Sequence, residues 1–167
     1  MPARTAEAAV EIDAPIEIIW RAMIDLAAYP EWNPFIVRAD APPGEPRPGT
    51  RMRLDVRWGS GGGARAVEEV TRLEPPPNAP PSSGRRAATF AYRFTGWLDT
   101  LGLVRGTRVQ MLEQTAGERA RYHTREEFRG LLCGFLPLAK VQDGFTRQAE
   151  ALRRRAEELA RKREEPT

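Results

Sequence analysis

The chain has 167 residues, 41% of them hydrophobic, and a formal net charge of +3. This length is typical of one domain, and a chain of this size buries roughly two-thirds of its unfolded surface. No apolar run approaches the ~18 residues of a membrane span, and the charged start "MPARTAEAAVEID" lacks the apolar core of a secretory signal. We therefore expect a cytoplasmic protein without a membrane span, with one domain over 1–163 and a frayed tail over 164–167.

The basic residues bear on which partners we expect, and the single cysteine bears on disulfides and the redox compartment. Arginine supplies 24 of the 26 basic residues, and they are spread along the whole chain. Nucleic-acid binding requires basic residues on one face with stacking aromatics between them, so coding bias of a GC-rich genome explains the arginines better. No nucleic-acid partner is expected, and the oligomeric state is left open. Cys133 has no second cysteine to pair with, which excludes an internal disulfide and fits a reducing compartment.

The N-terminal segment predicts a strand followed by a helix. Residues 6–12 alternate between apolar and polar side chains, which is typical of a strand. Pro15 suits the first turn of a helix, where a missing N–H costs nothing. Apolar residues at helical spacing then predict an amphipathic helix over 15–26: Ile16, Ile19, Trp20, Met23 and Ile24.

The stretch "YPEWNPFI" at 29–36 is expected to end this helix. Pro30 and Pro34 each disfavour the helical conformation in the residue before them. The stretch therefore allows only a short second helical turn over 31–35, after which the chain turns into the next strand.

The middle of the chain predicts six strands joined by turns. "RMRLDVRW" alternates cleanly between apolar and polar residues, as in an antiparallel strand with one buried face. "RAVEEVTRLE" is predicted as a strand, although its apolar spacing also suits a helix. Gly- and Pro-rich stretches separate the segments, and Thr115–Glu118 has the character of a hairpin turn. The expected strands are 35–41, 51–58, 65–74, 87–97, 106–114 and 119–130.

The last segment predicts one long amphipathic helix. Pro137 fits a helix start, and apolar residues follow at steps of three and four up to about Arg163. A helix with one apolar stripe must bury it, and the face of an antiparallel sheet is the only partner large enough. The order of elements therefore indicates an α+β fold, with room for a cavity between helix and sheet.

Two motifs carry a resemblance to a known family. "IDAPIEIIWRAMIDLAAYPEWNPFI" resembles the opening of the SRPBCC, or START-like, superfamily and its polyketide cyclase/dehydrase-like branch. "REEFRGLL" followed by "GFTRQAEALRRRAEEL" is similar to the last strand and long helix of that branch. The resemblance covers most of 6–160 and is weakest over 59–86. It implies a helix-grip fold: a curved seven-stranded antiparallel sheet around the C-terminal helix, with two short helices after the first strand and an internal hydrophobic cavity.

The alternation of the strands and the resemblance together predict the residues around this cavity. By resemblance, Trp32, Asn33 and Phe35 border its mouth. Core and cavity wall are nearly the same set in such a fold, and this set comprises Trp58, Phe90, Tyr92, Phe94, Phe128, Val141 and Phe145.

Polar residues that point into the cavity would say more about function than the apolar wall does. If Leu112 faces the helix, Gln110 and Arg108 do so as well; if Phe128 faces inward, so do Glu126, Thr124 and Tyr122. A three-residue loop over 116–118 pairs 112 with 122, 110 with 124 and 108 with 126. The competing register instead turns Val109, Met111 and His123 inward and gives an apolar wall.

Arg108 and Glu126 would then meet across neighbouring strands. The position of Arg108 is often His in the relatives, so a family-derived acid–base role does not carry over, because a guanidinium stays protonated. It could orient a carboxylate, carbonyl or phenolate of a ligand. The alternative is a structural ion pair near the rim of the sheet.

Catalytic, metal and nucleotide motifs find little support. His123 and Cys133 could form a thiol–imidazole couple, but no motif places them together. One His and one Cys cannot supply a metal site. Gly59–Ala64 matches GxGxxA, yet no helix clearly follows and no acidic residue lies about twenty positions on. No catalytic residue, metal or cofactor is therefore expected, and a flexible loop that gates the cavity is a better interpretation of 59–64.

Three functions are compatible with these observations. The leading hypothesis is binding of a small hydrophobic or aromatic molecule, lipid- or polyketide-like, between sheet and helix. The rival is a cyclase, aromatase or dehydratase that acts on a polyketide-like substrate, for which Arg108, Glu126, Thr124 and Tyr122 must converge on the cavity. The third is a co-chaperone-like interaction module, which needs an exposed apolar patch of several hundred Å²; no apolar run in the sequence predicts one.

Overall fold

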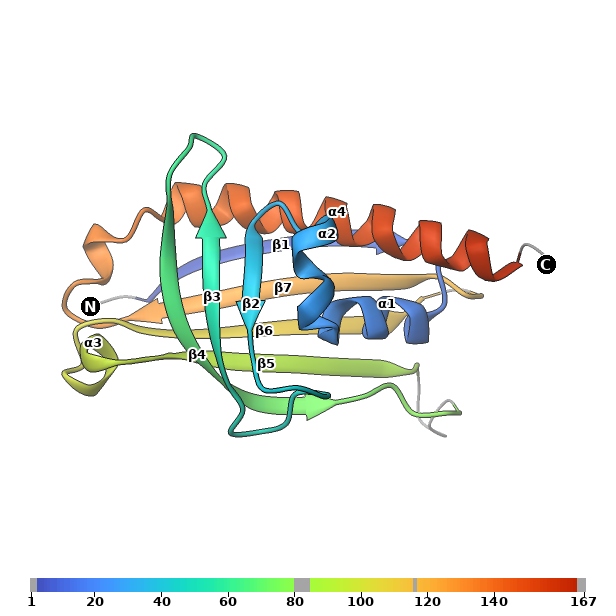
Figure 1. The fold of residues 1–167 in the computed structure, drawn as a ribbon, viewed down its shortest axis with the longest axis horizontal. Helices are drawn as coiled ribbons and strands as arrows, with labels where there is room; N and C mark the ends of the chain where they lie inside the picture. The colour runs from blue at the N-terminus through green and yellow to red at the C-terminus, as the bar shows by residue number, and fades with distance from the viewer. Residues whose placement is uncertain (1–2, 80–84, 116, 165–167) are drawn as a thin grey trace.

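A curved seven-stranded antiparallel sheet wraps around the C-terminal helix in this computed structural model (Figure 1), which describes residues 3–79, 85–115 and 117–164. The strand order is β1-β7-β6-β5-β4-β3-β2, so among the strands of the described residues only the connection from β1 to β2 does not join neighbours in the sheet. The predicted α+β helix-grip architecture is confirmed. Its elements are β1 (Arg4–Ile12), α1 (Ile16–Ile24), η1 (Leu26–Ala28), α2 (Tyr29–Trp32), β2 (Ile36–Asp40), β3 (Arg51–Arg57), β4 (Gly63–Glu74), β5 (Ala87–Thr95), α3 (Trp97–Thr100), β6 (Arg105–Gln114), β7 (Ala120–Arg129), η2 (Cys133–Phe135) and α4 (Leu138–Glu164).

The apolar stripe of α4 lies on the inner face of the sheet, as predicted. Phe145, Leu152 and Ala156 from this stripe are almost fully buried. Figure 1 shows α4 running along β1 and β7, while β2, β3 and β4 cross the view and curl toward it. Burial of one stripe along 27 residues thus holds the helix against the sheet. Glu164 still belongs to α4, and the rest of the predicted tail lies outside the described residues.

The hairpin of β6 and β7 has the register expected from a three-residue loop. Leu112 pairs with Tyr122, Gln110 with Thr124, and Arg108 with Glu126. These residues face α4, and the competing register, with Met111 inward, is wrong: Met111 is 39% exposed. Within the turn itself, residue 116 lies outside the described part of the chain.

The helical turn of the "YPEWNPFI" corner lies at Tyr29–Trp32 and not at 31–35 as predicted. Tyr29 was expected to leave the helical region because Pro30 follows, yet it has φ −54° and ψ −40°, and Pro30 lies in the first turn of α2. The Tyr29 hydroxyl donates a hydrogen bond of 2.7 Å to the Met23 carbonyl, which stabilises this conformation in the core. Asn33 is extended before Pro34, as predicted.

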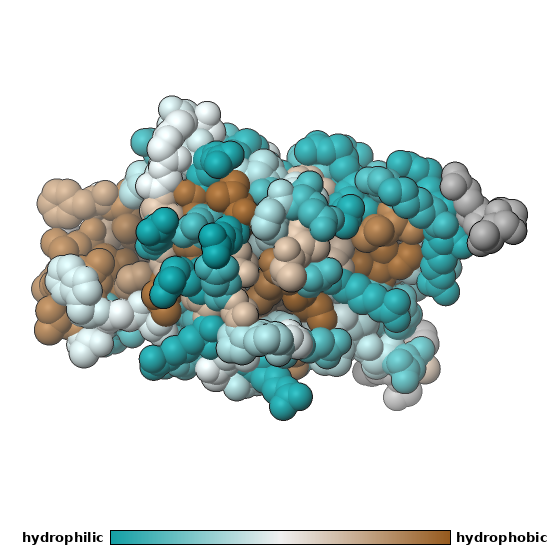
Figure 2. Space-filling view, in the orientation of Figure 1, coloured by the Kyte–Doolittle hydropathy of each residue, from teal (hydrophilic) through white to brown (hydrophobic). Residues whose placement is uncertain are grey.

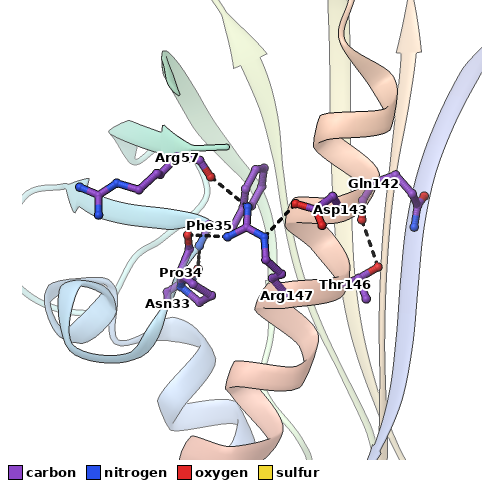
Figure 3. Close-up of polar contacts among 8 residues, drawn as sticks. All are labelled: Asn33, Pro34, Phe35, Arg57, Gln142, Asp143, Thr146 and Arg147. Atoms are coloured by element: carbon purple, nitrogen blue, oxygen red, sulfur yellow. Dashed lines mark hydrogen bonds and ion pairs between the residues drawn. The ribbon is translucent and has the colours of Figure 1, made fainter. Parts of the chain in front are cut away.

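The corner is tied to α4 and to β3 (Figure 3). The side-chain carbonyl of Asn33 accepts hydrogen bonds from the backbone N–H groups of Phe35 and Ile36, at 3.0 and 2.9 Å. From α4, Arg147 donates to the carbonyls of Pro34 and Arg57, at 2.9 and 3.1 Å. Asn33 therefore has a structural role inside the corner, and Arg147 holds the corner against the end of β3.

The segment 65–74, which also suited a helix, lies in strand β4. A register shift between Val70 and Arg72 interrupts its alternation, so that Val70 and Leu73 both contact the core although they are three residues apart. Before this bulge the alternation is regular: Val67 is exposed and Glu68 is buried. One of the Pro-rich stretches expected to separate the strands, residues 75–86, follows β4, and its residues 80–84 lie outside the described residues.

A stability prediction follows from the contact between α4 and the corner. A Cβ at Gly144 would lie 2.1 Å from Cδ2 of Phe35, whose ring packs against Trp58 and Phe145. Gly144→Ala should lower the free energy of unfolding because the ring must move. Overpacking costs about 1–3 kcal/mol, and so severe an overlap belongs at the upper end, above the ~1 kcal/mol gained from alanine in a helix.

Urea denaturation of the wild type and the variant measures this effect. Gly134→Ala is the matched control, because a Cβ at Gly134 has no atom within 4 Å. Equal transition midpoints for the two variants would show that Phe35 does not require a glycine opposite its ring.

Candidate ligand-binding cavity

A cavity of about 480 Å³ lies between the inner face of β3–β7 and the start of α4. Eight of the residues predicted to bind a ligand line it: Phe35, Trp58, Tyr92, Phe94, Arg108, Glu126, Phe128 and Val141. Most of this wall is apolar or aromatic, as is usual for sites that hold small organic molecules. A hollow of about 490 Å³ between α1 and residues 41–45 is of similar size, but it lies outside the sheet–helix interface and has no buried charged group on its wall.

The other seven predicted residues do not line the cavity. Phe90, Tyr122, Gln110, Thr124 and Phe145 are buried in the core. Trp32 packs edge-on against Tyr29, with ring centroids 5.2 Å apart, and Asn33 stabilises the corner. Trp32 and Asn33 therefore belong to the packing of the corner. Of the three residues predicted to border the mouth, Phe35 is the one that lines the cavity.

The mouth of the cavity lies beside the hairpin that joins β3 and β4. The exposed lining residues mark it: Gly63, Ala64 and Arg65 from the hairpin, and Pro137 before α4. The GxGxxA stretch at 59–64 is the turn of this hairpin and leads into β4, so the strand–turn–helix unit of a dinucleotide site is not formed here. That the hairpin gates the cavity stays a prediction.

An exposed apolar patch lies at the same end of the molecule, although no apolar run was identified in the sequence to predict one. Trp97, Leu101, Leu131 and Phe135 are between 64% and 85% exposed, and Figure 2 shows apolar surface gathered at that end. The patch combines residues of and next to α3 with the segment after β7, so its two halves lie about 30 positions apart in the sequence. The backbone N–H of Leu132 donates to the Leu103 carbonyl, at 2.8 Å, and joins the two segments.

Arg108 lies at the inner end of the cavity with a buried guanidinium. Its side chain donates hydrogen bonds to Thr124 Oγ1 at 2.9 Å, to the Tyr92 hydroxyl at 3.1 Å and to Gln148 Oε1 at 3.0 Å. Its Cζ also lies 4.0 Å from the ring centroid of Phe145, a cation–π contact. Three strands and α4 thereby hold the guanidinium in one orientation.

The predicted alternative of an ion pair between Arg108 and Glu126 is wrong. The two residues are cross-strand partners, but among the described residues no carboxylate oxygen lies within 4.0 Å of the Arg108 nitrogens. The reason is that neutral oxygens of β5, β7 and α4 already accept its hydrogen bonds. Nor is Arg108 at the rim: it is 2% exposed, beneath α4.

A second set of polar contacts lies next to Arg108 and joins Tyr122, Gln110 and Gln148. The Tyr122 hydroxyl donates to Gln110 Oε1 at 2.7 Å, and Gln148 Nε2 lies 3.5 Å from the same oxygen. Gln148 comes from α4 and was missed in the sequence, because it lies on a helix read for its apolar stripe. These buried amides connect the sheet to α4 through polar contacts. They also hold the Tyr122 hydroxyl in a hydrogen bond outside the cavity.

Two carboxyl groups face the cavity, and one of them was not predicted. Glu68 on β4 is 7% exposed and lines the cavity together with Glu126 on β7. Burial, reinforced by the charge of Glu126, raises the pKa of Glu68 well above its ordinary range, although Arg108 acts in the opposite direction. Burial also raises the pKa of Glu126 to about 7, again against the effect of Arg108. Two such carboxyl groups are candidates for contact with a ligand.

Glycine at position 106 makes room for Glu126. A Cβ built there would lie 2.9 Å from Glu126 Oε1 and 3.4 Å from the Phe128 ring. A side chain at this position would therefore displace the carboxyl group from the cavity wall.

His123 and Cys133 take no part in the cavity. His123 Nε2 lies 3.6 Å from Glu7 Oε2, and Cys133 is buried in η2. Within the described part of the chain no group of three or more His, Cys, Asp or Glu residues could hold a metal ion. No helix of the same residues is both long and apolar enough to span a membrane.

The raised pKa of Glu126 predicts how stability depends on pH. The folded chain releases the Glu126 proton near pH 7, whereas an ordinary glutamate releases it near 4.5, so the folded state binds more protons between these values. The free energy of unfolding should therefore fall as pH rises from about 4.5 to 7, by about 2–3 kcal/mol from this group. Glu126→Gln should flatten this dependence.

Urea denaturation at pH 5, 6, 7 and 8 measures the slope. Glu127→Gln is the matched control, because Glu127 is the neighbouring residue and pairs with Arg129 on the other face. A Glu126→Gln slope identical to that of the wild type would rule out a proton held by Glu126 in the folded state.

The comparisons with known proteins agree with this fold. The solved structures that resemble the chain include a hypothetical protein from Helicobacter pylori (12% identity, 92% of this chain and 88% of that chain, TM-score 0.70), the ZhuI aromatase/cyclase from Streptomyces sp. R1128 (16%, 93% and 94%, TM-score 0.65) and Ara h 8.0201 (14%, 96% and 99%, TM-score 0.60). At such identities the likeness establishes the fold alone. A comparison with curated protein sequences gives no significant match.

The sequence itself matches a family model described as "Polyketide cyclase / dehydrase and lipid transport" over residues 3–160. This match covers nearly the whole chain, and it includes both motifs on which the resemblance to the SRPBCC superfamily was based. The chain therefore belongs to the polyketide cyclase/dehydrase and lipid transport family of that superfamily.

Proposed function

We propose that this protein binds a small molecule with an apolar or aromatic body in the cavity between the sheet and α4. The observation that carries the proposal is the wall of the 480 Å³ cavity, where aromatic and aliphatic side chains surround a few polar groups. Trp58 and Phe94 belong to this wall. Burial of an apolar molecule against such a surface is favourable by roughly 25 cal/mol per Å², and the polar groups can select its orientation.

The arrangement of polar residues favours binding over the rival enzyme. That alternative requires Arg108, Glu126, Thr124 and Tyr122 to converge on one cavity. Arg108 and Glu126 reach it, whereas Thr124 accepts a hydrogen bond from Arg108 and Tyr122 donates one to Gln110. Two of the four groups are thus engaged inside the protein, and both are fully buried outside the lining of the cavity.

A substitution that fills the cavity tests the proposal. Ala66 lines the cavity from β4, and Ala66→Phe should reduce the affinity for Nile red, an uncharged apolar probe, by about tenfold or more because the added ring occupies the site. The matched control is Val67→Phe, because Val67 is the next residue of the same strand and faces solvent. Fluorescence titration measures both, with circular dichroism as the check on folding.

The control variant should bind the probe like the wild type. A folded Ala66→Phe variant with wild-type affinity would overturn the proposal, since the probe would then bind elsewhere. Native mass spectrometry of protein purified without detergent should also reveal a co-purified organic molecule, which Ala66→Phe should lose.

A further inference from the structure

The polar end of the cavity contains two carboxyl groups that have no partner in the protein. Neither Glu68 nor Glu126 takes part in a hydrogen bond or an ion pair through its side chain among the described residues. Glu68 is 93% buried, and both groups line the cavity. Buried polar groups are almost always hydrogen-bonded, and a buried carboxylate without a partner is costly. The cavity itself is where a partner can enter.

The neighbouring cation does not supply this partner. Arg108 directs its hydrogen bonds to Thr124, Tyr92 and Gln148, and Phe145 covers one face of its guanidinium. It therefore acts on the carboxyl groups through its field but not through contact. The carboxyl groups on the wall are pure acceptors once ionised, so the partner that stabilises the ionised pair is a donor.

The charges at this end of the cavity indicate what kind of donor fits. Two ionised glutamates beside one guanidinium leave a net charge of −1, which a ligand of charge +1 neutralises. An ammonium group also has three N–H donors for the two carboxylates, whereas a hydroxyl has one. A carboxylate ligand would be the third anion beside one guanidinium if both glutamates were ionised, and the second if one of them kept its proton.

We infer that the cavity takes a small molecule whose apolar ring carries a protonated amine, and that Glu68 and Glu126 bind its ammonium group. The inference rests on the proposed function, because the ring has to occupy the same apolar cavity. The aromatic wall suits such a molecule further: Trp58, Tyr92 and Phe94 line the cavity and can contact both a ring and a nearby cation.

Proton release on binding follows from the same arrangement. In the empty cavity the raised pKa values of the two carboxyl groups retain a proton near neutral pH, and an ammonium group replaces it, with the proton passing to solvent. The charged and titratable groups facing this end are Glu68 from β4, Tyr92 from β5, Arg108 from β6 and Glu126 from β7; Arg65 lies at the mouth, and Val141 of α4 adds no charge.

Three naphthalene derivatives with matched rings test the inference: 1-naphthylmethylamine, 1-naphthalenemethanol and 1-naphthoate. Isothermal titration calorimetry at pH 7 should give an affinity for the amine about tenfold or more above those for the alcohol and the carboxylate. Titrations in buffers of different ionisation enthalpy should show release of up to one proton with the amine alone. Glu68→Gln and Glu126→Gln should each lower the affinity for the amine about tenfold and change that for the uncharged alcohol by much less.

Glu127→Gln is the control for both variants, because its side chain lies on the outer face of β7 and pairs with Arg129. Alcohol binding that is lost in Ala66→Phe, with no preference for the amine, would overturn the inference and leave the proposed function standing. Tighter binding of 1-naphthoate, unaffected by the glutamine variants, would overturn it in favour of anions held by Arg108. Failure of all three molecules and of Nile red would overturn the proposed function itself.

Discussion

The buried guanidinium of Arg108 is the constraint on which the inner face of this protein depends. A cation removed from water must be surrounded by oriented acceptors, and here they come from Tyr92 on β5, Thr124 on β7 and Gln148 on α4. The ring of Phe145 covers the remaining face. One side chain thereby couples the register of three strands to the position of the helix along the sheet, because a shift of any of them would leave the charge unsatisfied.

The cavity begins where these contacts end. Beyond Arg108 the start of α4 and the curled strands leave a space of about 480 Å³, with aromatic walls and two carboxyl groups at its inner end. Membership of the family and likeness to aromatase/cyclase structures are compatible with many ligands. The unpartnered Glu68 and Glu126 are the basis on which we infer a positively charged donor, since an apolar wall by itself accepts any suitable ring.

Much of the fold was predictable because local patterns and global packing agree. The alternation of β6 and β7 and the length of their turn predicted that Arg108 pairs with Glu126, and this is the observed register. Glu68 was missed for a physical reason: the bulge after Val70 gives the apolar residues of β4 a spacing of three, which suits a helix and hides the alternation that places Glu68 inside. The partners of Arg108 escaped prediction too, because a register says which residues are neighbours and not which bonds they make.

The sequence by itself determined the class of fold, the order of the seven strands and the long C-terminal helix, and the buried faces of β3 and β5, because periodicity and turn residues act over a few positions along the chain. Only the tertiary structure decided which inward residues border a cavity and which fill the core. It also decided that Trp97 and Phe135, far apart in sequence, share one exposed apolar patch. These outcomes depend on where the curled sheet separates from α4, and that separation is set by contacts between residues distant along the chain.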